Sequence, residues 1–107
     1  MICRNHDPAS LRSPNMGEKP CLAPAGAEWL AQRQIKMLGI DTVFRLGKDV
    51  EDGRAIHEIL QSQDVCLIEF LDNLQALRKR EFFFIALPCK VKQIDSSWTR
   101  AIAIEEK

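Results

Sequence analysis

The fold is decided by the stretch RAIHEILQSQDVCLIEF, residues 54–70. Its first half, residues 54–61, places Ile56, Ile59 and Leu60 on one stripe at helical spacing and predicts a short helix. Its second half, residues 65–70, is a nearly continuous apolar run and predicts a strand that is buried on both faces. A helix followed directly by a buried strand is typical of an α/β layer structure.

The flanking residues extend this pattern in both directions. Residues 27–38 carry an apolar helical face that ends before Gly39, and the short β-branched run at 40–44 predicts a strand. Charged, glycine-flanked residues at 47–53 predict a loop. Further along, we expect a short helix or turn at 71–77. Two more strands follow, a central strand of the sheet at 82–87 and a last strand at 98–104. The predicted fold class is mixed α/β.

The first 26 residues differ from the rest of the chain. They contain four of its five prolines and no periodic apolar pattern. Such a composition buries too little apolar surface to offset the entropy of the chain. We therefore expect a flexible N-terminal segment at 1–26 and one α/β domain at 27–107.

Composition excludes several classes of protein. The chain has 107 residues with 15 basic and 15 acidic side chains, so its net charge gives no footprint for nucleic acid or an anionic membrane. It has no apolar run near the ~20 residues of a membrane helix and no apolar leader. Its four cysteines form no C-x-x-C pair, which predicts free thiols that pack as small hydrophobes. We expect a cytoplasmic protein without a nucleic-acid or membrane partner.

Two side chains in the deciding stretch carry candidate chemistry. His57 lies at the edge of the predicted helical stripe, but Gln61 stands where an H-E-x-x-H zinc motif needs its second histidine. Glu69 ends the predicted strand, where α/β proteins collect ligands, and a carboxylate in an apolar run is costly unless paired or metal-bound. A purely structural alternative is that Glu69 reaches solvent or pairs with Arg78 or Lys90. The residues alone favour that alternative.

A wider resemblance changes this balance. Several segments, in this order and spacing, resemble the second half of the cyclase family of metal-dependent hydrolases, which includes bacterial kynurenine formamidase (arylformamidase). The resemblance runs from near residue 20 to residue 104. Its segments are AEWL at 27–30, IKMLGIDT at 35–42, IHEIL at 56–60, LIEFLDNL at 67–74, IALPCK at 85–90 and RAIAI at 100–104.

The resemblance implies a fold and an activity. The fold would be the C-terminal part of a β/α/β layer enzyme, here a half-domain. The activity would be hydrolysis of an amide or formamide, such as N-formylkynurenine to kynurenine in tryptophan catabolism. His57 and Glu69 stand at the family's positions for two metal ligands, and the metal would be zinc, with manganese as the alternative. Implied partners are a small-molecule amide substrate and either further copies of the chain or a complementary half.

The departures from the family are also informative. The family's main metal-binding signature, H-x-G-T-H-x-D, is absent, so the metal site is incomplete and no catalytic residue is assigned. Phe70 replaces the small or amide residue that usually follows the glutamate, and residues 1–19, 45–54 and 95–98 do not fit the family pattern. The expectation is a truncated, inactive fragment of such an enzyme. The alternative is a non-catalytic assembly module built from the same half-fold.

Overall fold

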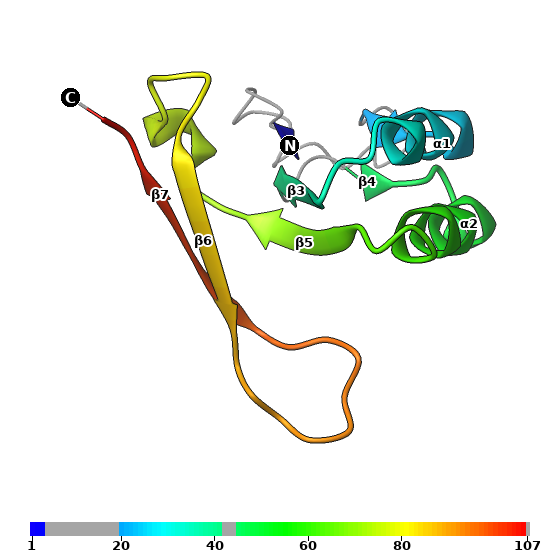
Figure 1. Ribbon diagram of the computed structural model, residues 1–107. Helices are drawn as coiled ribbons and strands as arrows, with labels where there is room; N and C mark the ends of the chain where they lie inside the picture. The colour runs from blue at the N-terminus through cyan, green and yellow to red at the C-terminus, as the bar shows by residue number, and fades with distance from the viewer. Residues whose placement is uncertain (4–19, 42–44, 107) are drawn as a thin grey trace, which may run out of the picture. The chain divides into compact units, whose positions relative to one another are not determined.

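The computed structural model describes residues 1–3, 20–41 and 45–106, and these form two compact units (Figure 1). The first unit is Met1–Asp72 and the second begins at Asn73. Residues on both sides of position 26 are paired within the first unit.

The first unit contains a parallel sheet and a small parallel strand pair. The sheet has the order β1 (Ile2–Cys3), β3 (Met37–Asp41) and β5 (Cys66–Leu71). The pair consists of β2 (Cys21–Leu22) and β4 (Arg45–Leu46). Parallel strands joined through helices are the α/β arrangement, so the predicted fold class is confirmed.

Two helices cover one face of this sheet. Helices α1 (Pro24–Gln32) and α2 (Val50–Gln61) lie side by side in Figure 1 and pack against each other. Leu38 and Ile40 are on the same face of β3 and belong to the core shared with both helices. The buried members of this core are Ala27, Leu30, Leu38, Ile40, Ile56, Leu60 and Val65.

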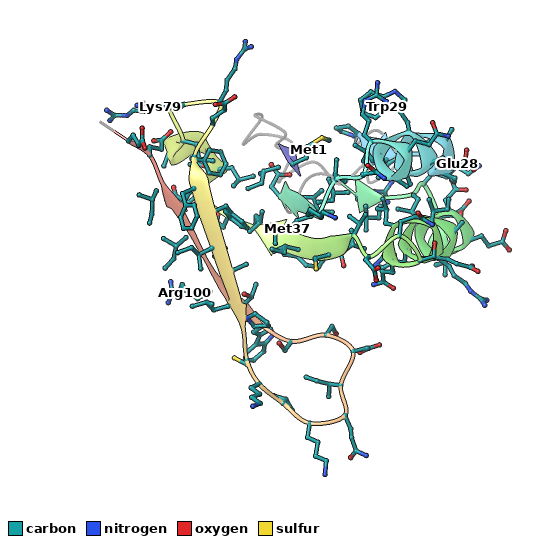
Figure 2. All side chains as sticks on the ribbon, in the orientation of Figure 1. Met1, Glu28, Trp29, Met37, Lys79 and Arg100 are labelled. Carbon is teal, nitrogen blue, oxygen red and sulfur yellow. The ribbon has the colours of Figure 1, made fainter. Side chains whose placement is uncertain are left out.

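The N-terminal segment is partly ordered by pairing. In β1, Ile2 and Cys3 pair with Gly39 and Ile40, and the Met1 amino group donates to the Met37 carbonyl over 2.8 Å. Figure 2 labels Met1 and Met37 in this region. Strand β2 and the start of α1 also fall within 1–26, and residues 4–19 lie outside the described part, so the expected flexibility of this segment stays a prediction. The composition of residues 1–26 could not predict β1 and β2, because the strands with which they pair, β3 and β4, are distant in sequence.

The first helix is shorter than its apolar pattern predicted. It begins at Pro24, whose fixed φ suits a first helical turn, and the chain turns away at Gln34 with φ of 53°. Leu38 consequently belongs to β3 and not to a helix over 27–38, and Gly39 lies inside the same strand. Gly39 packs closely against side chains, since a Cβ there would lie 2.8 Å from Cδ1 of Leu71, and relieving that contact would require the Leu71 side chain to move. The predicted role of Gly39 as a helix stop is wrong.

The second helix begins earlier than predicted. Residues 47–53 were expected as a loop, but α2 starts at Val50 because Asp49 caps it by accepting from the Asp52 backbone N–H over 2.9 Å. Gly47, with φ of 80°, brings the preceding loop against this first turn; a Cβ there would lie 2.5 Å from the Gly53 nitrogen.

Strand β5 contains an irregularity beside the candidate site. Gly39 pairs with Ile68 and Asp41 with Leu71, so β5 has one more residue than β3 between these pairs. The strand was expected to be buried on both faces, yet Phe70 is exposed and has φ of 58°. A bulge that uses a left-handed residue accounts for both features. Regular pairing with β3 is therefore interrupted between Ile68 and Leu71.

The second unit is a hairpin with a short helical turn. Strands β6 (Phe83–Pro88) and β7 (Thr99–Ile104) pair antiparallel, and the turn at η3 (Leu74–Ala76) confirms the short helix or turn predicted at 71–77. The segment at 82–87 was expected as a central strand, but in the described part of the chain β6 pairs with β7 alone. Several apolar side chains of the hairpin are consequently exposed: Phe83, Leu87, Ile102 and Ile104.

Candidate functional site

His57 is oriented by its own helix. It lies on α2, next to the fully buried Ile56, and its Nδ1 is 2.7 Å from the Gly53 carbonyl oxygen one turn earlier. A carbonyl oxygen only accepts, so Nδ1 is the donor and carries a proton. In the neutral ring, Nε2 then holds the lone pair that a metal ion requires. Sequence reasoning did not single out Gly53, although its i−4 spacing from His57 was the available signal.

Glu69 faces this nitrogen from the neighbouring strand. Its Oε2 is 3.7 Å from Nε2 of His57, and each of the two side chains keeps 38% of its surface exposed. Glu69 lies near the carboxyl end of β5, and α2 packs on that strand, so the two predicted site residues meet between one helix and one strand. The ion-pair partner that the structure gives Glu69 is His57. The two residues that the resemblance implies as metal ligands therefore lie close together.

The pair has the chemistry of an incomplete metal site. Imidazole nitrogen and carboxylate oxygen both ligate zinc at about 2.0–2.2 Å, so two ligands of one ion lie within about 4 Å of each other. The separation of 3.7 Å meets that requirement. Within residues 1–3, 20–41 and 45–106, no group of three or more His, Cys, Asp or Glu side chains is placed to hold a metal ion. The described donor set is thus limited to two.

The cysteines lie elsewhere and do not add to the pair. All four are free, and Cys21, Cys66 and Cys89 are exposed, which corrects the expectation that they pack as small hydrophobes. Cys3 is partly buried in β1, and this burial raises the pKa of its thiol above the ordinary value. A thiol held in its neutral form is a poor metal ligand and nucleophile.

Asp41 is a further carboxylate at this end of the sheet. It is the last residue of β3, it is 9% exposed, and its register partner on β5 is Leu71. The sequence indicated only a strand or loop residue at this position. The sequence did not predict that Asp41 would be buried. The expected strand at 40–44 placed Asp41 near the start of a strand, whereas it is the last residue of β3.

Comparisons with known proteins bear on this geometry. No family model matches the chain, and no curated protein shows significant similarity to it. A solved structure described as a potential metal-dependent hydrolase with cyclase activity matches with a TM-score of 0.66 and 29% identity over 79% of this chain. The resemblance to the cyclase family is confirmed. The match spans 41% of that protein's length, so this chain corresponds to a part of a cyclase-type hydrolase fold.

The pair of His57 and Glu69 lies in a fold that is similar to that of a metal-dependent hydrolase. The similar protein is described as metal-dependent, and the described part of this chain brings together one imidazole and one carboxylate. Within the same part of the chain, no helix is long and apolar enough to cross a bilayer.

Proposed function

We propose that this chain carries one half of the metal site of a cyclase-type hydrolase, with His57 and Glu69 as its ligands. The observation that carries the proposal is the 3.7 Å separation of His57 Nε2 and Glu69 Oε2 in a fold similar to a metal-dependent hydrolase. Phe70, which replaces the small or amide residue that usually follows this glutamate in the family, is exposed. That substitution leaves both ligands in place.

Each group in this site has a distinct role. The Gly53 carbonyl holds the proton on Nδ1 of His57, so Nε2 is the ligating atom, and Glu69 supplies an anionic oxygen. The metal is zinc, with manganese as the alternative, because both accept imidazole and carboxylate ligands. When bound, the metal activates water and polarises the carbonyl of the substrate. The substrate class is an amide or formamide, with N-formylkynurenine as the specific candidate and arylformamidase as the activity.

The chain by itself is inactive in this proposal. Catalytic zinc sites use three protein ligands and keep one position for water or substrate, whereas the described residues offer two. The missing ligands belong to the H-x-G-T-H-x-D half of the family site, and the chain is a truncated form of the whole enzyme. A complementary half that bears this motif would restore the site.

Complementation tests the proposal directly. The full chain is mixed with the first half of a cyclase-family enzyme and Zn²⁺, and hydrolysis of N-formylkynurenine is followed together with zinc retention. Activity and zinc retention should appear only in the mixture, and His57→Ala or Glu69→Ala should remove both. Glu58→Ala is the matched control, because Glu58 is an exposed carboxylate next to His57 in sequence. Activity that survives either ligand substitution would refute the assignment.

The hairpin favours a second candidate function. Phe83 and Leu87 on β6 are 66% and 63% exposed, and Ile102 and Ile104 on β7 are also exposed. Exposed apolar side chains on a sheet favour association. A non-catalytic assembly module would bind a homologous or complementary chain through this surface without turnover. Complex formation that is lost in Phe83→Lys, with no hydrolysis in any mixture, would favour this function over the first.

A further inference from the structure

The two-ligand site is open as well as incomplete. His57 and Glu69 each remain 38% exposed, and no third His, Cys, Asp or Glu joins them among the residues that the structure describes. A zinc ion held by two ligands keeps two coordination positions for other donors. The donors best suited to fill them are another imidazole and another carboxylate.

We infer that one divalent cation is bound between two copies of this chain, each of which contributes His57 and Glu69. This inference rests on the proposed role of the two residues as metal ligands. A two-fold axis through the metal presents the same pair from both copies, which is the self-complementary contact of a symmetric dimer. Two imidazoles and two carboxylates complete four-fold coordination and neutralise the charge of the cation.

The two ligands and the residue that follows Glu69 are accessible. Phe70 is 74% exposed on the bulge, so the strand that carries Glu69 also presents an exposed apolar side chain. The formal net charge of the chain is zero, so two copies do not repel each other at long range. Nδ1 of His57 is occupied by the Gly53 carbonyl, which leaves Nε2 as the atom that the ring can offer to a shared ion.

The association should depend on the metal. A stable protein interface buries about 1,200–2,000 Å², whereas one aromatic side chain supplies about 150–250 Å². Phe70 alone is therefore too small to hold two copies together. Coordination has to supply most of the binding free energy, and removal of the metal should separate the copies.

The test measures mass and zinc content with Zn²⁺ alone as the probe. The full chain is analysed by sedimentation velocity and light scattering with chelator, with Zn²⁺ and after re-chelation, and the bound zinc is quantified. We expect a reversible doubling of the metal-free mass, which is 12.2 kDa for one chain, with one zinc per two chains. With Co²⁺ in place of zinc, the absorption spectrum should lack sulfur-to-cobalt charge transfer, because no thiol is a ligand.

Four variants identify the ligands. His57→Ala and Glu69→Ala should each abolish the zinc-dependent doubling. His6→Ala, which removes the other histidine of the sequence, and Glu58→Ala are the matched controls and should behave as the parent chain. Persistence of the doubling in both ligand variants, loss of it in His6→Ala, or a thiolate band with Co²⁺ would overturn the shared site.

Failure of this inference and failure of the proposed function give different results. One zinc per chain without a change in mass, lost in His57→Ala, overturns the shared site and leaves the two residues as ligands. No zinc uptake by the chain alone also overturns the shared site, while the complementation experiment still tests the ligands. A complementary mixture whose activity is insensitive to His57→Ala overturns the proposed function itself.

Discussion

Phe70 should be a destabilising residue where it stands, and replacing it should stabilise the first unit. Its φ of 58° lies in the left-handed region, which costs an L-residue other than glycine about 1–2 kcal/mol. Asparagine tolerates this region much better than phenylalanine. We expect Phe70→Asn to remove most of that cost.

The gain is offset only slightly by lost contacts. Full burial of a phenylalanine contributes about 1.5–3 kcal/mol, but Phe70 is 74% exposed, so the part that packs contributes roughly 0.5 kcal/mol. The net effect of Phe70→Asn is about 1 kcal/mol in favour of the folded state. For a unit of this size, that corresponds to a rise in Tm of about 4–8 °C.

Urea and thermal unfolding followed by circular dichroism at 222 nm provide the assay, because both helices belong to the first unit. Phe70→Ala separates the backbone from the side chain, since alanine keeps the left-handed cost and loses the ring; it should destabilise by about 0.5 kcal/mol. If Phe70→Asn were no more stable than Phe70→Ala, the conformational argument would be refuted.

Substitutions at Asp49, Ile56 and Cys3, with their controls, test the rest of the fold. Asp49→Ala removes the cap on the Asp52 N–H and should cost about 1 kcal/mol in thermal unfolding, whereas Asp49→Ser should keep most of it. Ile56→Ala opens a cavity at a fully buried position and should cost about 2–5 kcal/mol by urea titration, against less than about 0.5 kcal/mol for Val50→Ala at an 88% exposed position. Burial raises the pKa of Cys3, so the folded state retains the thiol proton longer than the unfolded state; stability should fall as the pH rises above about 8.5, and Cys3→Ala should flatten that slope. Alkylation of Cys3 at pH 8 should also be slower than that of the exposed cysteines, as peptide mass spectrometry would show.

Local pattern placed the two candidate residues on their elements, and the resemblance alone implied that they are metal ligands. Helical spacing at 54–61 placed His57 beside a buried stripe, and the apolar run that follows placed Glu69 near the end of a strand. A helix that packs on the next strand brings residues twelve apart in sequence within reach of each other. The resemblance named the same two residues as ligands. Their 3.7 Å approach and the contact between Nδ1 of His57 and the Gly53 carbonyl needed the structure.

The sequence by itself determined where apolar periodicity changes from helix to strand, because that signal is local. Only the tertiary structure decided which backbone groups pair. Leu38 continues the apolar face of a helix, yet it lies in β3 because the sheet pairs it with Leu67. The run at 82–87 reads as a central strand, yet it pairs in a hairpin with Phe83 and Leu87 exposed. Phe70 carries no sequence signal for a left-handed residue; its conformation follows from the register between β3 and β5, which depends on residues about thirty positions away.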